Sequence, residues 1–286
     1  MKLIKYFFQF IFIFFLFMIF KILGLKNSSN FASLLSKKIG PFFRSKELIS
    51  KNILKAFPNI SKDDLNHVAT NMWGNYGRIL AEYVFLKNFR KTTPTINLKV
   101  VGQEILDEIR KNKKPVIFIS GHFNNFELMA MHIEKSGINL ATIYRPLNNP
   151  FLNVLMENIR KKYICKNQIK KGFAGSRQLL SFFKNSYSIA LMIDQRVSQG
   201  IKSKFFNNEA YTTTIPAQLV KKFNCKIVPI YIERIGDVNF TLTINNSIEY
   251  SNEHSIKDIT LDLNQRIEKM ILNRPEQWIW SHNRWK

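Results

Sequence analysis

The sequence contains few cysteines and few acidic residues. Its 286 residues include two cysteines, Cys165 and Cys225, too few for a disulfide framework and outside any C-x-x-C zinc pattern. Asp and Glu number 20 against 43 Lys and Arg, which gives a formal net charge of +23. This excess favours anionic partners, and nucleic acid, acidic proteins and anionic lipid surfaces all qualify. With 45% hydrophobic residues the chain can fill a sizeable core.

One long apolar run stands near the N-terminus. From Tyr6 to Phe20 the only polar residue is Gln9, and apolar residues resume after Lys21, so the run approaches the ~20 residues that span a bilayer. It indicates an N-terminal membrane anchor over residues 1–26. A cleaved signal peptide is the alternative, but the run is long and no convincing A-x-A site follows it. Lys and Arg are more frequent after the run than before it, which predicts a single pass with residues 27–286 facing the cytoplasm.

The remaining residues predict one α/β domain with a central, mostly parallel sheet flanked by helices. Short apolar runs that read as strands alternate with helical patterns, as expected for such a sheet. The predicted strands are 116–119, 140–143, 189–193 and 227–232, with a further, edge strand at 240–244. The predicted helices are 61–83, 103–111, 151–162, 175–183, 214–223 and 256–272.

His122 and Glu127 follow the first of the central strands. Ligands gather at the carboxyl ends of strands in such sheets, and His122 lies at that position. Asn124 or Asn125 is expected to cap the next helix, which places Glu127 in its first turn. A histidine beside a carboxylate can take a proton from a substrate hydroxyl, so no serine nucleophile is needed, and no G-x-S-x-G motif occurs. On this motif alone, helix capping is the more frequent explanation of the pattern.

The surrounding residues resemble a known family. GHFNNFE fits the His-x-x-x-x-Asp/Glu signature of glycerolipid-type acyltransferases, and the chain is similar to the lipid A late acyltransferases, the lauroyl and myristoyl transferases of Gram-negative bacteria. The likeness runs through YRPLNNP, KKGFAGSRQLL, LMIDQ and KFFNNEAYTT to the C-terminal NRPEQWIWSHNRWK. Asn207 and Ile215 depart from the family pattern, where glycine and a small residue are usual.

This resemblance implies an enzyme of the inner membrane. It would transfer a fatty acyl group from a thioester on acyl carrier protein, or from acyl-CoA, to a hydroxyl of a lipid A precursor, without metal or cofactor. His122 would be the general base and Glu127 its orienting partner. Arg145, after the next strand, would bind a phosphate of the acceptor or the tetrahedral oxyanion. Asp194 and Gln195 would line the site, and basic clusters would meet acidic substrates and anionic lipids.

Two alternatives remain open at this stage. The acceptor could be another glycolipid or a phospholipid, because the chemistry requires only a thioester and an alcohol. The charge also allows a membrane-tethered protein that binds nucleic acid, although the sequence contains no recognised nucleic-acid motif.

Overall fold

The computed structural model describes residues 1–91 and 98–286, and only the backbone of Phe173. The first part contains α1 (Lys2–Leu23), α2 (Leu25–Ile39), η1 (Gly40–Phe42), α3 (Lys46–Ala56), α4 (Lys62–Glu82), η2 (Tyr83–Phe85) and α5 (Leu86–Lys91). The central part contains β1 (Leu98–Val101), α6 (Gln103–Asn112), β2 (Ile117–Ser120), α7 (Glu127–Lys135), β3 (Leu140–Tyr144), α8 (Pro150–Tyr163), β4 (Asn167–Lys170), α9 (Phe173–Lys184) and β5 (Ser188–Met192). The rest contains β6 (Ile201–Phe205), β7 (Asn208–Thr212), α10 (Ile215–Phe223), β8 (Ile227–Gly236), β9 (Asn239–Ile244), α11 (Ile256–Asn273) and η3 (Pro275–Gln277).

The main sheet has seven strands in the order β1-β9-β8-β2-β5-β3-β4. All of its strand pairs are parallel except β8 with β9, so the predicted α/β fold with a mostly parallel sheet is confirmed. The prediction that 240–244 forms an edge strand was wrong, because β1 pairs with β9 and covers that edge. β6 and β7 form a separate antiparallel pair.

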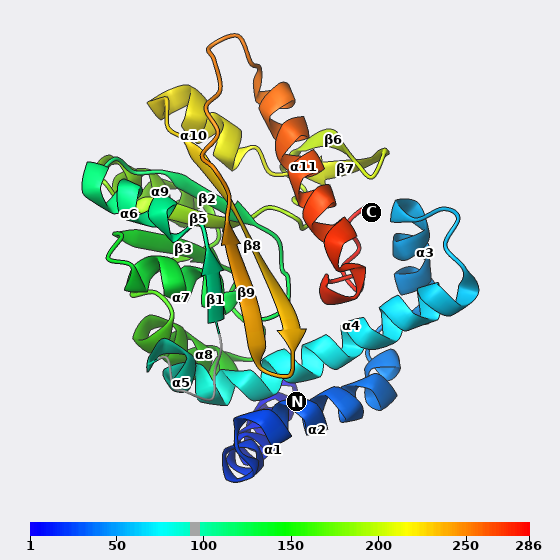
Figure 1. Ribbon diagram of the computed structural model, residues 1–286. Helices are drawn as coiled ribbons and strands as arrows, with labels where there is room; N and C mark the ends of the chain where they lie inside the picture. The colour runs from blue at the N-terminus through cyan, green and yellow to red at the C-terminus, as the bar shows by residue number, and fades with distance from the viewer. Residues whose placement is uncertain (92–97) are drawn as a thin grey trace.

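Helices cover both faces of the sheet (Figure 1). On one face α7 packs beside α6, and the ring of His132 bonds to Gln103 across the two helices at 2.7 Å. Arg90 of α5 bonds to α7 and to the end of α8, which joins these helices into one layer. On the other face the rings of Phe183 in α9 and Phe223 in α10 lie 4.9 Å apart. All four residues of β2 are buried between the layers, as expected of a central parallel strand.

The N-terminal helices lie beneath this sheet, across one end of the molecule (Figure 1). Gly24, with φ of 77°, ends α1 and lets α2 leave in a new direction. Helix α2 then packs closely on α4, where a Cβ atom at Gly77 would lie 2.1 Å from the carbonyl oxygen of Ala32. Helix α4 begins as predicted, with the Ser61 hydroxyl accepting the backbone N–H of Asp64.

Candidate active site

Two adjacent parallel strands bring His122 and Asp194 together. Strands β2 and β5 pair in a register that places Ser120 opposite Met192. His122 and Asp194 each follow two residues later, at the carboxyl edge of the sheet, where ligands of such sheets bind. The next strand, β3, ends at Tyr144, so Arg145 follows at the same edge.

The Asp194 carboxylate holds the His122 ring. Its Oδ1 lies 2.8 Å from His122 Nδ1, and its Oδ2 accepts the backbone N–H of His122 at 2.8 Å. Oδ2 also accepts a hydrogen bond from the indole nitrogen of Trp278 at 2.8 Å. An ionised carboxylate is an acceptor only, so Nδ1 must carry the ring proton and the neutral ring keeps a lone pair on Nε2.

Asp194 is ionised despite its complete burial. Its residue is 1% exposed, and burial alone would raise the pKa of the carboxyl. The nearby His122, together with hydrogen bonds from His122 and Trp278, lowers that pKa to about 2. The carboxylate therefore stays charged at any pH near neutrality.

The pairing expected between His122 and Glu127 is replaced by this arrangement. In the part of the chain that the structure describes, no hydrogen bond or ion pair joins the two residues, although both face the same cavity. Glu127 Oε1 instead accepts the Arg160 Nε–H at 2.8 Å and the hydroxyl of Tyr83. Glu127 begins the regular part of α7, whereas His122 lies in the preceding turn, and the two side chains bond to different partners.

Arg160 is held in place by two partners. It contacts the Glu127 carboxylate and donates from Nη2 to the Tyr83 hydroxyl at 2.9 Å. Burial would lower the pKa of this guanidinium, but Glu127 and Tyr83 raise it above its ordinary value, so the group stays cationic. Burial and Glu127 raise the pKa of Tyr83, which keeps its proton. The result is an oriented cation at the cavity wall.

The asparagines in the turn between β2 and α7 bond to distant parts of the chain and do not cap α7. Phe126 occupies the N-cap position of α7, so the expected Asn cap was wrong. The Asn124 amide bonds to Gln277, which itself bonds to the backbone of Arg234. The Asn125 amide donates to Glu82 at 3.0 Å. These contacts fix the turn that carries His122.

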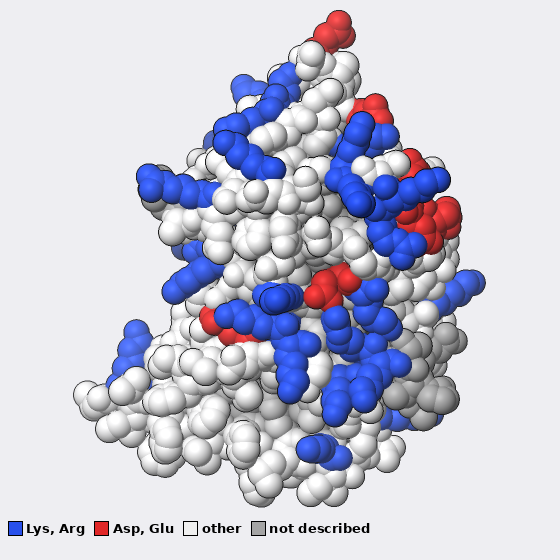
Figure 2. Space-filling model, turned by 90° about the vertical axis from the view of Figure 1, so that its left-hand side faces the viewer, with Lys and Arg blue, Asp and Glu red and all other residues white. Residues whose placement is uncertain are grey.

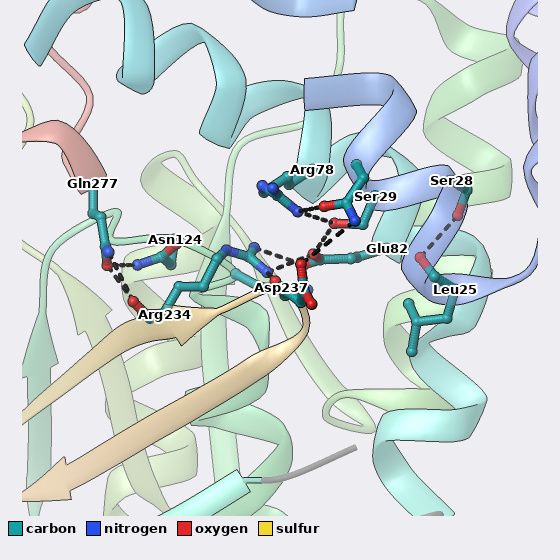
Figure 3. A network of polar contacts seen from close by, with 11 residues as sticks. Leu25, Ser28, Ser29, Arg78, Glu82, Asn124, Arg234, Asp237 and Gln277 are labelled. Carbon is teal, nitrogen blue, oxygen red and sulfur yellow. Dashed lines mark hydrogen bonds and ion pairs between the residues drawn. The ribbon is translucent and has the colours of Figure 1, made fainter. Parts of the chain in front are cut away.

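The Glu82 carboxylate links this turn to α2, α4 and β8. It is fully buried at the end of α4 and forms an ion pair with Arg234 of β8 at 2.7 Å. The hydroxyl of Ser29 in α2 also donates to Glu82, and Arg78 donates to Ser29. Figure 3 shows this network, in which α2, α4 and the β8–β9 hairpin converge on one carboxylate.

A cavity of about 390 Å³ opens at this edge of the sheet. Its walls are largely apolar and include Phe118, Met129, Ile133, Leu179 and Leu191. Its charged and polar lining includes His122, Glu127, Arg145, Arg160, Lys170, Lys171, Gln195 and Arg196. The predicted site residues Arg145 and Gln195 thus lie on the cavity with His122 and Glu127, while Asp194 lies behind the histidine ring. The size falls within the usual range for small-molecule and lipid-chain sites.

The C-terminal segment closes one side of the site. Trp278 and Trp280 are both buried, and Trp278 in addition bonds to Asp194. His282 accepts the backbone N–H of Arg196 through Nε2 at 3.1 Å and borders the cavity. Burial lowers the pKa of His282 to about 4, although Asp194 acts in the opposite direction. His282 is therefore neutral near pH 7 and serves as a hydrogen-bonded structural residue.

Sequence reasoning missed three features of the site: the contact of Asp194 with the ring, the place of Arg160, and the bond from Trp278. Asp194 had a detectable signal, because it follows a predicted strand just as His122 does. Arg160 and Trp278 reach the site from α8 and from the C-terminal segment. Local patterns carry no information on such distant contacts.

Comparisons with known proteins show which proteins the chain is similar to. The family model described as bacterial lipid A biosynthesis acyltransferase matches residues 1–286. The lipid A biosynthesis myristoyltransferase of Escherichia coli K12 is 22% identical over 250 residues, covering 85% of this chain and 75% of that protein. The lauroyltransferase of the same organism is 23% identical over 251 residues, covering 85% and 79%. A crystal structure of the 1-acyl-sn-glycerophosphate acyltransferase PlsC from Thermotoga maritima is similar, with a TM-score of 0.42 and 12% identity. The match covers 87% of this chain and 97% of that one.

Proposed function

The chain belongs to the bacterial lipid A biosynthesis acyltransferases, and from that premise we propose that it transfers a fatty acyl group from a thioester to a hydroxyl of a lipid A precursor. It is an O-acyltransferase, which makes a nucleic-acid partner unnecessary to explain its charge. The observation that carries the proposal is a histidine, oriented by an ionised carboxylate, on the wall of a largely apolar cavity.

His122 acts as the general base through Nε2. Asp194 keeps the proton on Nδ1 and stabilises the imidazolium that forms. Nε2 removes the proton of the acceptor hydroxyl while that oxygen attacks the thioester carbonyl carbon. The tetrahedral intermediate then collapses, the carbon–sulfur bond breaks, and the imidazolium returns the proton to the departing thiolate. A base in this position contributes on the order of 10²–10⁴ in rate.

Arg160 and Arg145 supply positive charge at the same opening. Glu127 and Tyr83 occupy Nε and Nη2 of Arg160, which leaves Nη1 to stabilise the oxyanion of the intermediate. Glu127 therefore acts by positioning Arg160 on the wall of the cavity that His122 also lines. Arg145, exposed at the cavity rim, binds a phosphate of the acceptor, and Gln195 bonds to its polar groups.

The donor is acyl carrier protein, with acyl-CoA as the alternative. Figure 2 shows Lys and Arg gathered over the middle of one face of the molecule, a surface suited to an acidic carrier protein and a phosphorylated acceptor. Helix α1, with a mean hydropathy of 2.3 over its most apolar window, associates the enzyme with the inner membrane. That α1 crosses the bilayer once, with the domain facing the cytoplasm, stays a prediction of the sequence.

Replacing the base tests this function. We expect His122→Ala to remain folded, with a normal thermal transition, and to lose acyl transfer from acyl carrier protein to a lipid A precursor by about 10²-fold or more. Mass spectrometry of lipid A from cells with and without the active protein identifies the acyl chain and the acceptor hydroxyl. Normal turnover by the alanine variant would remove His122 from the mechanism. Transfer to a phospholipid alone would replace the proposed acceptor.

A further inference from the structure

The turn between β2 and α7, residues 121–126 and here called the histidine turn, has a left-handed residue at its centre. Asn124 is fully buried and has a φ of 43°, in the region that a Cβ atom disfavours. The neighbouring Asn125 is fully buried as well. His122, the proposed base, lies only two residues before Asn124. The place of its Nε2 atom therefore depends on what holds this turn.

Gln277 holds Asn124 from outside the turn. The backbone N–H of Asn124 donates to the Gln277 carbonyl oxygen at 3.1 Å, and the Asn124 side-chain amide donates to the Gln277 side-chain oxygen. The same Gln277 amide accepts the backbone N–H of Arg234 at 3.0 Å and donates to the Arg234 carbonyl at 3.0 Å. Asn124 is thus connected with β8 through its main chain and its side chain.

The Gln277 side chain takes the place of a strand beside β8. Strand β8 has ten residues, whereas β2 has four and pairs with β8 only at Ile227, Val228 and Pro229. In the described part of the sheet, no other strand lies on that side of β8. An edge without a partner presents unpaired N–H and C=O groups. The Gln277 amide bonds to both of these groups on Arg234, as a neighbouring peptide unit would.

The Arg234 guanidinium holds the second asparagine. Its Nη1 and Nη2 lie 2.7 and 3.0 Å from the two carboxylate oxygens of Glu82, a bidentate arrangement that fixes the direction of both groups. Glu82 Oε2 also accepts the Asn125 amide at 3.0 Å. The guanidinium carbon of Arg234 lies 4.4 Å from the centre of the Phe240 ring, which restrains its rotation. Asn125 is therefore held by β8 as well, through a different route.

Both routes end at one residue that does not touch the cavity. Figure 3 shows Arg234 with Gln277 and Asn124 on one side and Glu82 on the other. Among the described residues, the cavity lining includes neither Arg234 nor its partners Gln277 and Glu82. Any effect of these three side chains on transfer must therefore act through the histidine turn.

We propose that Arg234 is the anchor of the histidine turn and that Gln277 and Glu82 are positioning residues. Through the two asparagines they set the place of the His122 Nε2 atom relative to the acceptor hydroxyl. Asp194 fixes the rotation of the ring, and this network fixes the backbone that carries it. The role assigned to the network rests on the proposed function, in which His122 is the base.

The network imposes geometry at a cost in stability. Three of its buried atoms, Asn124 Oδ1, Asn125 Oδ1 and Arg234 Nε, have no hydrogen-bond partner among the described residues, and each such group is unfavourable in the folded state. A buried ion pair like that of Arg234 with Glu82 often stabilises a fold no more than apolar residues of the same volume. Stability alone therefore does not account for these side chains, whereas a fixed turn beside the base does.

Asn124→Gly separates positioning from stability. Glycine adopts a φ of 43° without penalty, which offsets the lost amide bond, so the thermal midpoint of unfolding should change little. The turn is then held less firmly. We expect kcat for transfer from acyl carrier protein to a lipid A precursor to fall by about 10-fold or more, with KM changed less than about twofold. A kcat equal to that of the parent protein would overturn the proposal.

Gln277→Ala and Arg234→Lys each remove one route. Lysine keeps the charge but cannot form the bidentate pair with Glu82. Each variant should lower kcat by about 10- to 100-fold at nearly unchanged KM. Ser188→Ala is the matched control, because the buried Ser188 hydroxyl accepts the Val116 N–H at the opposite end of β2 and β5. It should lower the thermal midpoint and leave kcat unchanged. An equal loss of kcat in this control would show a structural role only and refute the positioning role.

Proton nuclear magnetic resonance provides a readout that does not depend on transfer. Full-length protein with isotope-labelled histidine, in detergent micelles, should show the His122 Nδ1–H that bonds to Asp194 far downfield, identified by its loss in His122→Ala. This resonance should weaken several-fold in Gln277→Ala and Arg234→Lys and persist in Ser188→Ala. An unchanged resonance in both variants would contradict the anchor. Normal turnover by His122→Ala would remove the proposed function alone, because the resonance still reports how firmly the ring is held.

Discussion

The exchange of Asp194 for Asn tests the orientation of the proposed base, His122, while it leaves the other contacts of the site in place. The amide oxygen of Asn can still accept the backbone N–H of His122 and the indole N–H of Trp278, both of which bond to Oδ2. The amide NH₂ then takes the place of Oδ1 and faces His122 Nδ1. Two of three hydrogen bonds are kept and the third is reversed.

The reversed bond has a defined chemical effect. An amide donor requires Nδ1 to be an acceptor, so the neutral ring moves its proton to Nε2, which can no longer act as the base. We expect kcat to fall by about 10²–10⁴-fold while KM changes little, since Asp194 lies behind the ring. The carboxylate, whose pKa is about 2 against an ordinary 3.8, also contributes on the order of 2 kcal/mol to stability at neutral pH.

The assay measures kcat and KM for transfer from acyl carrier protein to a lipid A precursor, alongside thermal unfolding. Asp258→Asn is the matched control, because Asp258 closes the capping box of α11 far from the cavity. It should lower stability slightly and leave kcat unchanged. Glu127→Gln is the decisive comparison. If Asp194→Asn kept normal kcat while Glu127→Gln abolished it, Glu127 and not Asp194 would orient the histidine, and the proposed role of Asp194 would be refuted.

Three further changes have expected outcomes. Trp278→Phe removes the indole donor to Asp194, so the free energy of unfolding should fall by about 1.5–3 kcal/mol, with a smaller loss of kcat than in Asp194→Asn; an unchanged denaturant midpoint would contradict this. Gly77→Ala places a Cβ 2.1 Å from a carbonyl oxygen of α2 and should lower the free energy of unfolding by about 1–3 kcal/mol. Gly236→Ala is the control, because a Cβ there would meet no described atom within 4 Å, and its free energy of unfolding should be unchanged. His282 has a pKa of about 4, held below its ordinary 6.5 by burial; the unfolded chain therefore binds more protons between these values, and stability should decrease as pH falls from about 6.5 to 4. The free energy of unfolding of His282→Gln should decrease less between pH 6.5 and 4 than that of the parent protein. An equally steep decrease would exclude His282 as the source of the pH dependence.

The sequence predicted the central strands and helices because their burial leaves a clear pattern. Strand β2 is a short apolar run, and all of it is buried. Strand β4 was missed because Ile169 is its only buried residue and its polar sequence is that of an edge strand. Helix α2 was missed for the opposite reason, since Ser and Ala face the domain while its apolar residues face outward. Hydrophobic periodicity identifies an element only when the apolar side is the buried side.

Most of the residues proposed for the site were expected at one edge of the sheet, but their pairing was not predicted. His122, Glu127, Arg145 and Gln195 all border the cavity, because each follows or begins an element at the same edge of the sheet. Asp194 was expected to line the site, yet its contact with the histidine depends on β5 lying next to β2. Strand order is set by long-range packing and cannot be read from spacing along one segment.

A carboxylate from the neighbouring strand suits the role of orienting group better than one from the same turn. Two paired parallel strands fix their ends relative to each other through backbone hydrogen bonds, including the bond from Ile193 to the Ser120 carbonyl at 3.0 Å. A residue five positions away, across the start of a helix, has no such constraint. The site also needs Trp278 on Asp194 and Gln277 on the asparagine turn, so the base is fully held only once the C-terminal segment has packed. Its tryptophan-rich sequence thus completes the proposed site from the far end of the chain.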